Sequence, residues 1–427
     1  MASKTYLCID LKSFYASVEC VDAGLDPMSA RLVVADESRG DTTICLAVTP
    51  ALKALGVPSR PRLFQVPRRL HPIIAPPRMK RYMDVSSRIY GLYLKRISPA
   101  DIHVYSIDEC FIDATPYLSF YGLDARGLAN LLREDVRRET GIYATVGIGP
   151  NLFLAKIALD ITAKHSPDFI GEVDERTFRE TLWFHRPLTD IWGIGPGIAR
   201  RLAAMGAHDL AGVAALPSEA LYRKFGANAE YLIDHAWGQE PCTIAEIQAY
   251  EPESTSMTNG QVLPCDYSYE EARMVMHEMI DESVLEIVEH RRVASRISLS
   301  VGYARGEGAH GARDLAYPHT ATSRVLGQRT DSRRVLMERF NELFGQNVRR
   351  DVPIRRIVIG LGDLVDEAYR TRTLFDDEEA DEKERNLQGA IVDVRHRFGK
   401  NALLKATSLK DKATAIERNS QIGGHRA

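Results

Sequence analysis

Tyr105–Asp113 reads Y-S-I-D-E-C-F-I-D, the pattern of a β-hairpin bend that carries two adjacent carboxylates, Asp108 and Glu109, at its tip. The flanking residues are apolar, β-branched and aromatic, as is typical of strands. Unpaired charge is costly inside such an apolar run. A divalent cation would offset that cost, because magnesium takes one or two protein carboxylates and completes its octahedron with water and substrate phosphates. The stretch therefore predicts a hairpin that carries part of a metal site.

The N-terminus offers the missing ligand. Tyr6–Glu19 reads Y-L-C-I-D-L-K-S-F-Y-A-S-V-E, which predicts a short buried strand that ends at Asp10 and turns into a helix. Taken alone, an Asp at the end of a strand is more often a helix cap than a metal ligand. Asp10 becomes a candidate ligand because the acidic hairpin accompanies it.

The two stretches together resemble a known family. The pattern D-x-x-x-F-Y-A-x-V-E near the start, followed by Y-S-I-D-E-x-F-(I/L)-D, resembles the Y-family translesion DNA polymerases, and within them the UmuC-like branch. The resemblance extends over approximately residues 5–365. It implies a template-directed DNA polymerase that adds deoxynucleotides by a two-metal mechanism and copies past damaged bases at low fidelity.

Composition sets the bounds for any interpretation. The 427 residues are 44% hydrophobic and 26% charged, which is typical of a globular protein of roughly two to four domains. The six cysteines lack C-x-x-C spacing, and there is neither a signal-peptide core nor an apolar run of membrane-spanning length. We expect a cytoplasmic protein with no membrane partner. A net charge of -3 excludes a chain that is basic throughout, but DNA binding needs only a local basic face.

The N-terminal elements predict an α+β fold. Strands at 5–10, at the acidic hairpin and at 142–149 alternate with helices at 12–22, 78–97 and 121–140, in the order βαββαβ with an insertion. This is the ferredoxin-like arrangement, and it places Asp10 beside the Asp108–Glu109 hairpin. The resemblance makes it a polymerase palm (1–10 and 78–165) with small fingers (11–77).

The resemblance also implies roles for residues of the active site. Asp10 and Asp108 would bridge two Mg²⁺ ions, Glu109 would complete one ion site, and the Leu11 carbonyl would bind the ion on the triphosphate. The residues implied to contact the incoming deoxynucleoside triphosphate are Phe14, Tyr15 as the steric gate, Lys53 and Lys164.

Some of these assignments have structural alternatives. Tyr15 also suits a core position beside Phe14. Lys156 and Lys164 also suit a solvated helix face, and Lys164 follows the A-K-I-A segment with one residue more than is usual in the family. Lys12 replaces an acid found in some relatives. Pro50 stands where many relatives carry an aromatic residue that touches phosphate.

The next segment predicts a helical thumb over 166–250. Leu188–Leu202 reads L-T-D-I-W-G-I-G-P-G-I-A-R-R-L and resembles the second half of a helix-hairpin-helix motif. Gly193 and Gly195 would let backbone amides approach a DNA phosphate, aided by the positive end of the following helix.

Residues 251–365 predict an α/β domain that matches, by its order in the chain, the little finger of Y-family polymerases. A linker at 251–260 precedes helices at 269–290 and 331–346 and strands at 295–303 and 354–361. From Arg291 to Arg356 there are 14 Arg, no Lys and 6 acids, a local excess of +8. Arg forks suit the phosphates of primer-template DNA, although a salt-bridged surface is the alternative. The residues expected to bind DNA here are Arg291, Arg292, Arg333 and Arg334.

Residues 366–427 predict a flexible acidic tail, with an acidic run at 376–382. Thr371–Phe375 resembles the clamp-binding peptide of bacterial polymerases, with Thr371 where Gln is expected. Leu374 and Phe375 would anchor the protein to the replication sliding clamp or, alternatively, pack on the little finger. An amphipathic helix is expected at 384–398, with Leu387, Ile391, Val394 and Phe398 on one side.

Two other functions are compatible with parts of the sequence: another two-metal phosphotransferase on a palm fold, and a non-catalytic DNA-binding subunit. The first class includes nucleases and nucleotide cyclases, and a cyclase has no need of the Gly-Ile-Gly turn or the Arg-rich domain. The second has no need of three convergent carboxylates.

Overall fold

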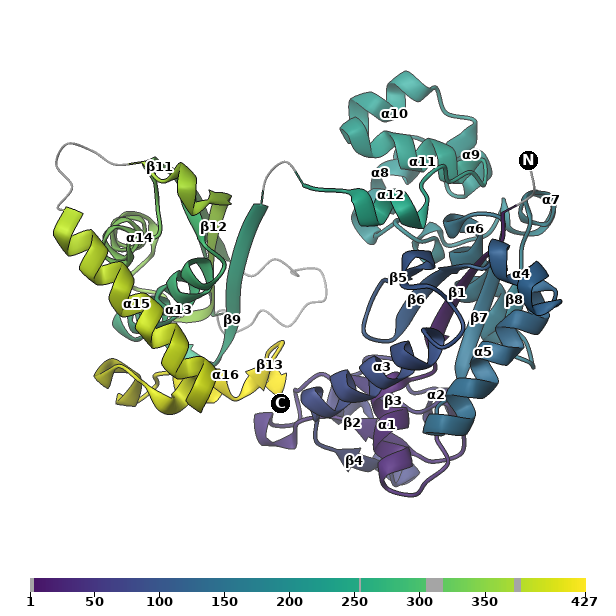
Figure 1. The fold of residues 1–427 in the computed structure, drawn as a ribbon, viewed down its shortest axis with the longest axis horizontal. Coiled ribbons are helices and arrows are strands. Elements are labelled where there is room, and N and C mark those ends of the chain that lie inside the picture. Colours follow the sequence, from purple (N-terminus) through teal and green to yellow (C-terminus); the bar gives the residue numbers. More distant parts are fainter. Residues whose placement is uncertain (1–3, 253–254, 305–317, 372–377) are drawn as a thin grey trace. The chain divides into compact units, whose positions relative to one another are not determined.

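The computed structural model describes residues 4–252, 255–304, 318–371 and 378–427. They form two compact units, residues 1–250 and 251–427, and Figure 1 shows the elements of each. In these ranges, none of the helices combines the length and the apolarity that crossing a bilayer requires.

The first unit is built on a five-stranded sheet. Its strands, in spatial order, are β5 (Ile102–Val104), β6 (Glu109–Asp113), β1 (Tyr6–Leu11), β7 (Ala144–Gly149) and β8 (Ile170–Glu172). The first four have the antiparallel order of a ferredoxin-like fold, so the predicted fold class is confirmed. Strand β8 adds a parallel neighbour to β7.

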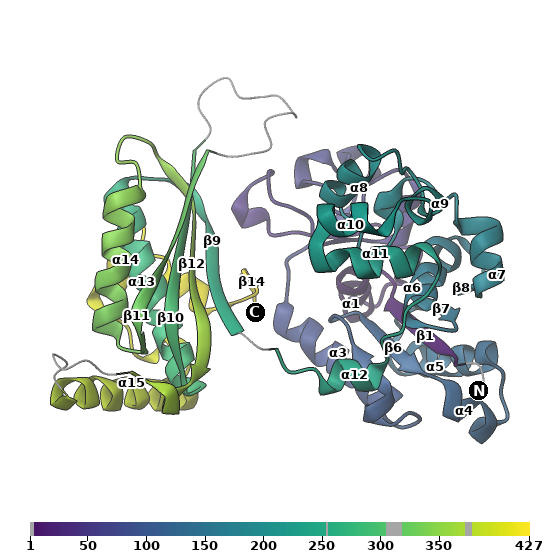
Figure 2. The same cartoon turned by 90° about the horizontal axis from the view of Figure 1, so that it is seen from above.

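The two faces of this sheet bury alternate residues of β1, as the strand period of two requires. Leu7, Ile9 and Leu11 pack against helices α3 (Met79–Tyr93) and α5 (Ala125–Thr140). The face that carries Tyr6 and Cys8 packs against helix α6 (Leu152–Ile157). Figure 2 shows this unit from above. Asp10 follows Cys8 by two residues and therefore belongs to the α6 face.

The predicted fingers contain a second, smaller sheet. Its elements are α1 (Phe14–Asp22), β2 (Leu32–Val34), β3 (Ala47–Val48), α2 (Pro50–Ala54) and β4 (Ile73–Ala75), with strand order β3-β2-β4. A core of its own forms around Val33, Val48 and Leu52. Helix α1 packs instead into the palm core through Phe14 and Val18.

Short helices make up the rest of the first unit. They are α4 (Thr115–Tyr121), α7 (Glu175–Thr177), α8 (Pro196–Ala203), α9 (Leu210–Ala214), α10 (Ser218–Phe225), α11 (Ala229–Ala236) and α12 (Ile244–Ala249). Helices α8 to α11 gather around a core that includes Phe153, Phe178 and Leu221. Helix α12 returns to the palm, where Gln248 Nε2 donates to the Ile102 carbonyl at 2.9 Å.

The second unit contains an antiparallel sheet whose helices lie on one face. Its strands, in spatial order, are β11 (His319–Thr330), β10 (Arg292–Tyr303), β12 (Ile354–Asp366) and β9 (Thr255–Tyr267). Helices α13 (Tyr269–Glu289) and α14 (Arg333–Asn347) cover the face that buries Ile297, Leu299 and Ile359.

Two of these strands differ from the prediction. The expected linker at 251–260 is wrong from Thr255 onward, where β9 begins, and β11 was not anticipated. Both strands lie at the edges of the sheet. Their sequences alternate half-buried residues with exposed ones that are polar or small apart from Val262 and Val325, so they have less apolar content than the other strands.

The C-terminal segment is folded, which corrects the predicted flexible tail. Helix α15 (Glu378–Phe398) begins inside the acidic run, and α16 (Ala415–Asn419), β13 (Gln421–Ile422) and β14 (His425–Arg426) follow. Carboxylates of α13 hold the segment. Glu278 accepts hydrogen bonds from the amides of Thr414 (2.8 Å) and Ala415 (3.2 Å), and Glu282 accepts one from Arg395.

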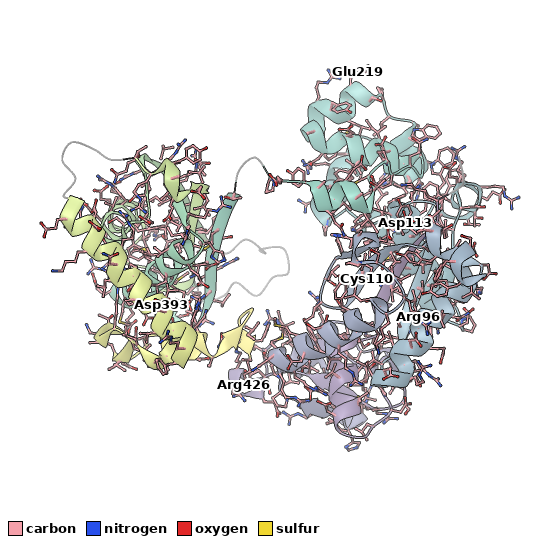
Figure 3. The ribbon with its side chains drawn as sticks, viewed as in Figure 1. Arg96, Cys110, Asp113, Glu219, Asp393 and Arg426 are labelled. Atoms are coloured by element: carbon pink, nitrogen blue, oxygen red, sulfur yellow. The ribbon has the colours of Figure 1, made fainter. Side chains whose placement is uncertain are left out.

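Helix α15 turns inward only part of the apolar side that was expected, since Ile391 and Val394 are half-buried. Leu387 is 59% exposed and Phe398 74% exposed, whereas Gln388 is buried. The side turned to the domain is polar and pairs with neighbouring helices, for example through Arg395 and Glu282. Asp393 is on the exposed side (Figure 3).

Candidate active site

The antiparallel pairing of β1 with β6 brings the acidic residues together. Asp10 stands directly opposite Glu109, and the Leu11 amide donates to the Asp108 carbonyl at 2.9 Å. The bend between β5 and β6 is closed by the amides of Tyr105 and Ser106, which both donate to the Glu109 carbonyl at 3.0 Å. The hairpin predicted from Y-S-I-D-E is thus present, with Asp108 in its bend and Glu109 at the start of β6.

Each of the three carboxylates has a different partner. Ser106 Oγ donates to Asp108 Oδ1 at 2.7 Å. Glu109 Oε1 lies 2.6 Å from Lys156 Nζ and accepts from Cys8 Sγ at 3.2 Å. Asp10 Oδ2 lies 3.8 Å from Lys164 Nζ. Three acids and two lysines therefore share this end of the sheet.

The electrostatics of the site leave negative charge in excess. Burial raises the pKa of Asp10 to about 7, because desolvation penalises the carboxylate. Lys164 opposes that shift, and the neighbouring Asp108 and Glu109 add to it. A divalent cation would stabilise the ionised form of Asp10.

The donor set fits a hard cation. Carboxylate and carbonyl oxygens are the ligands that magnesium prefers, and Asp10, Leu11, Asp108 and Glu109 are neighbours through the β1–β6 register. In the part of the chain that the structure describes, no three His, Cys, Asp or Glu side chains are gathered into a finished metal site. The carboxylates are directed at other partners instead: Glu109 is turned to Lys156, and Asp108 is turned to Ser106.

Lys156 is not a solvated helix lysine, so that alternative is wrong for this residue. Its side chain is 8% exposed, and its ammonium lies 2.6 Å from Glu109 and 3.1 Å from Asp160 Oδ2. The sequence signal for this placement is the i,i+4 spacing of Lys156 and Asp160 on a helix with an apolar core face.

Lys164 reaches the site through a π-helical turn, η5 (Ala158–Thr162), which follows α6 directly. Such turns take one extra residue into a helix. The additional residue before Lys164 is therefore accommodated without moving the lysine away. Its ammonium lies 2.7 Å from Asp160 and 3.8 Å from Asp10.

Close packing holds this helix on the sheet. A Cβ added at Gly147 would lie 2.1 Å from the Ala155 carbonyl oxygen, and one at Gly171 would lie 2.5 Å from that of Ala158. Only glycine permits so close an approach of the helix backbone to the strands. The two glycines thereby fix how far Lys156 and Lys164 extend along the sheet.

The candidate nucleotide residues lie at the start of α1 and in α2. Lys53 Nζ donates to Ser13 Oγ at 3.0 Å, and Lys12 Nζ lies 3.9 Å from the centre of the Phe169 ring. Burial lowers the pKa of both Lys12 and Lys53. Lys53 lowers that of Lys12 further, so the two ammonium groups are close enough to repel each other. This positive charge suits a polyphosphate.

The aromatic pair behaves differently at its two positions. Phe14 is 2% exposed and belongs to the palm core. Tyr15 is half-buried, and its ring stacks on that of Tyr82 with 4.5 Å between centroids and 22° between planes. The Tyr82 hydroxyl donates to Glu19 at 2.7 Å. Tyr82 therefore supports the Tyr15 ring from one side.

The Gly-Ile-Gly turn stands at the beginning of α8. Gly193 has a φ of 83°, and Gly195 is the N-cap residue of the helix. Trp192, next to the turn, donates from Nε1 to the Tyr105 hydroxyl at 3.0 Å, so the turn is tied to the acidic hairpin. Arg200 and Arg201 lie in the last turn of α8.

The four arginines expected to bind DNA fall into two groups. Arg291 and Arg292 are exposed at the start of β10. Arg333 donates to Asp281 at 2.6 Å, and Arg334 lies 3.6 Å from Asp381. Ion pairs within the domain compete with phosphate for the second group, and both residues belong to α14 on the helix-covered side.

The open face of the second sheet was not singled out from the sequence. It carries small residues in cross-strand register, including Ser298 opposite Gly360 and Ser300 opposite Val358. Exposed Arg356 lies on the same face, opposite Gly302. The signal that could have revealed this face is the alternation of Ser and Gly with buried Ile, Leu and Val in β10 and β12.

The expected clamp anchors Leu374 and Phe375 lie outside the described residues. Thr371, which precedes them, is described: its Oγ1 accepts from the Arg329 amide at 2.6 Å, and its own amide donates to the Arg329 carbonyl at 3.2 Å.

Fold and site indicate a class of protein: a palm with three acidic residues at the meeting of β1 and the β5–β6 hairpin, followed by a helical domain with a Gly-Ile-Gly turn, is typical of a nucleotidyl-transferring polymerase. Two family models match the chain, the impB/mucB/samB family over residues 9–160 and its C-terminal domain over 254–374.

Two relatives come from Bacillus subtilis (strain 168). The putative UV-damage repair protein UvrX is 32% identical, over 99% of this chain and 98% of its own length. DNA polymerase IV 2 is 31% identical, over 100% of this chain and 99% of its own length. Among solved structures, a Y-family DNA polymerase chimera of Dbh and Dpo4 shares the fold, with a TM-score of 0.65, 21% identity, and coverage of 85% of this chain and 99% of that one.

The chain belongs to the impB/mucB/samB family, that is, to the Y-family translesion DNA polymerases. It is a DNA-directed DNA polymerase that uses DNA and nucleotide substrates. Enzymes of this family depend on divalent metal ions.

Proposed function

We propose that Asp10, Asp108 and Glu109 form the catalytic centre of this polymerase and hold two Mg²⁺ ions, with the Leu11 carbonyl as a further ligand. The observation that carries this proposal is the register of β1 with β6, which sets Asp10 opposite Glu109 and bonds Leu11 to Asp108. When bound, two metal ions stabilise the attacking and leaving oxygens of an in-line displacement. The three carboxylates would hold the positively charged ions at this end of the sheet.

The cationic residues around the site are suited to the triphosphate of the incoming nucleotide. Lys53 lies near Ser13, and Lys164 lies near Asp10. Along the chain, one lysine precedes the Asp108–Glu109 pair and the other follows it. Ammonium groups at these positions bind and orient phosphate oxygens as point charges. Half-buried Tyr15, stacked on Tyr82, then acts as the steric gate below the sugar.

The small fingers support copying past damaged bases at low fidelity. Their sheet has strands of only three, two and three residues, and their core is a separate, small cluster around Val33 and Leu52. So small a domain offers little surface with which to check the shape of a new base pair.

All six cysteines are free, which supports the expected cytoplasmic location.

Primer extension tests this proposal. On an undamaged template and on one with an abasic site, the protein should extend a labelled primer when Mg²⁺ is present and stop when a chelator removes it. Extension that is indifferent to the chelator would refute the metal assignment. Binding of the primer-template without any extension would refute catalysis by these three residues.

The Gly-Ile-Gly turn is expected to contact a DNA phosphate. Nothing in the protein lies within 4 Å of a Cβ placed on Gly195, so Gly195→Val should leave the melting temperature nearly unchanged. If the backbone approaches a phosphate here, the bulk should weaken primer-template binding by about tenfold, equivalent to the loss of roughly one charged hydrogen bond. Fluorescence anisotropy at two salt concentrations measures this.

A matched control lies two residues further on. Gly197 also has open space around its Cβ and sits inside the first turn of α8. Gly197→Val should therefore bind DNA nearly as the parent does. Equal affinities for the parent and Gly195→Val would remove the turn from the DNA interface.

In the second domain, the open sheet face suits DNA better than the α14 arginines do. The Ser298–Gly360 and Ser300–Val358 pairs keep the face flat. A Cβ at Gly360 would come within 2.4 Å of Ser298 Oγ, so the flatness is built into the packing. Exposed Arg356, with Arg291 and Arg292, can reach the sugar-phosphate backbone from this sheet.

The clamp peptide remains a prediction from sequence. A synthetic peptide spanning residues 368–380 should bind the host's sliding clamp modestly, because Thr371 cannot offer the amide hydrogen bonds of a Gln. Leu374→Ala with Phe375→Ala should abolish binding, and Thr371→Gln should strengthen it. No binding by the parent peptide, together with no gain from Thr371→Gln, would contradict the proposal.

A further inference from the structure

An alternating chain of charges lies beneath the candidate catalytic centre. In order, its members are Glu109, Lys156, Asp160, Lys164 and Asp10. The ammonium-to-carboxylate distances along it are 2.6, 3.1, 2.7 and 3.8 Å. Both ends are candidate metal ligands, so the chain connects the two opposed acids of the β1–β6 pair through the helix that covers them.

Lys156 is the buried link of this chain. Its side chain is 8% exposed and that of Glu109 is 11% exposed. A buried ammonium is stable only when its charge is paired and its protons are bonded. Glu109 and Asp160 supply the two carboxylates. Lys156 therefore holds Glu109 in place as long as Asp160 holds Lys156.

Asp160 is the branch point, and the helix geometry explains why. It stands four residues after Lys156 and four before Lys164, so both lysines lie on its side of the helix. Oδ2 lies 3.1 Å from Lys156 Nζ, and Oδ1 lies 2.7 Å from Lys164 Nζ. The π-helical turn 158–162 contains Asp160. Oδ1 also accepts from Lys156 Nζ at 3.3 Å, so one carboxylate fixes both ammonium groups.

The second ammonium has a competing partner. Lys164 Nζ lies 2.7 Å from Asp160 and, at 3.8 Å, is also within reach of Asp10. The structure shows contacts of Lys164 with two acids, Asp160 and Asp10. If Asp160 lost its charge, Lys164 would turn to Asp10. An ammonium paired with Asp10 would compete with a divalent cation for the same carboxylate.

We propose that Asp160 is a positioning residue that keeps Lys164 away from Asp10, so that Asp10 stays available to metal and Lys164 to the triphosphate, and that shares the ammonium of Lys156 with Glu109. This inference rests on the proposed roles of Asp10, Glu109 and Lys164. Asp160 itself contacts neither metal nor nucleotide. Its effect on both passes through the two lysines.

The test is a double-mutant cycle read by metal binding rather than by turnover alone. Free Mn²⁺ is measured by electron paramagnetic resonance during titration of the full-length protein. Asp160→Asn keeps the shape of the side chain and removes its charge. It should weaken Mn²⁺ binding by about tenfold, within the range of couplings seen inside one ion-pair network, and raise KM for the deoxynucleotide more than it lowers kcat.

The second mutation separates positioning from general damage. Adding Lys164→Met to Asp160→Asn removes the competing ammonium, so Mn²⁺ affinity should return to within about twofold of the parent. A purely structural defect would persist in the double variant. The control is Glu134→Gln, which breaks an exposed pair with Arg137 (3.5 Å) in the same domain and should change neither quantity.

The outcomes distinguish the inference from the function it rests on. Unchanged Mn²⁺ affinity in Asp160→Asn, or a loss that Lys164→Met does not restore, overturns the positioning role. Unchanged KM in Lys164→Met alone refutes the proposed phosphate contact instead. Should Asp160→Asn fail to fold, Lys164→Met alone decides: Mn²⁺ must then bind at least as tightly as in the parent, and weaker binding overturns the inference.

Discussion

Asp108→Asn will abolish nucleotide addition in a protein that is still folded and still binds primer-template. Asp108 lies in the bend of the acidic hairpin, and its carboxylate accepts from Ser106 Oγ at 2.7 Å. An amide keeps that hydrogen bond, so the cost to stability should be below about 1 kcal/mol. Loss of one carboxylate from a two-metal centre should cost about 4 kcal/mol of transition-state stabilisation, or about a thousandfold in rate.

Asp113→Asn is the matched control for that experiment. Asp113 ends β6, the strand that follows the bend, pairs across the sheet with Tyr6 at the far end from Asp10, and caps the Thr115 amide at 3.0 Å. Its replacement should leave single-turnover extension within about twofold of the parent, as for surface changes away from a site. Substantial extension by Asp108→Asn in Mg²⁺ would contradict the assignment of the catalytic centre.

Glu109→Gln should be equally inactive but less stable. Glu109 is the closest anionic partner of buried Lys156, at 2.6 Å. Its removal leaves Lys156 with Asp160 as its remaining carboxylate partner, and breaking such a buried pair costs up to about 3 kcal/mol. A lower melting temperature in Glu109→Gln than in Asp108→Asn would therefore report the Lys156 contact and not a failure of the metal assignment.

The palm could be predicted because its elements obey simple periods. The helix expected at 78–97 was assigned from Tyr82, Val85, Ile89 and Leu92, and all four are buried on α3. Asp10 and Glu109 could be placed together because antiparallel strands bring the end of one beside the start of the next. Such regularities depend on apolar spacing, which a sequence displays directly.

The sequence does not reveal polar side chains that are buried because they pair with opposite charges. Lys156 is buried against carboxylates, and α15 turns its polar side, with Arg395, toward α13. Apolar spacing predicts the opposite for both. Ion pairs become visible only when the partner's position in space is known, and the partner of Lys156 lies on a strand 47 positions earlier in the chain.

The extra residue between the A-K-I-A segment and Lys164 also limited the prediction for that lysine. One extra residue in a regular α-helix would rotate the lysine by roughly 100° from the site. The π-helical turn 158–162 absorbs it. No propensity distinguishes A-L-D-I-T as a π turn, because the turn is stabilised by the sheet below it, where Gly147 and Gly171 allow contact.

Tyr15→Ala should admit ribonucleotides that the parent protein rejects. The Tyr15 ring is stacked on Tyr82, whose hydroxyl is bonded to Glu19, which in turn pairs with Arg78 at 2.7 Å. This support fixes the ring from one side, so it cannot retreat when a 2′-hydroxyl approaches its other side. A rigid steric contact of this kind discriminates by about 2 to 3 kcal/mol, so its loss should relax sugar selectivity by about a hundredfold.

Tyr15→Phe is the control, because it keeps the ring and its stacking on Tyr82 while removing only the hydroxyl. The measurement is the ratio of kcat/KM for a deoxynucleotide to that for the matching ribonucleotide, on one template. Tyr15→Phe should retain the parent's ratio, and Tyr15→Ala should approach unity. If instead Tyr15→Ala lowers the melting temperature and leaves the ratio unchanged, the ring is a packing element of α1 and α3, and another residue excludes the 2′-hydroxyl.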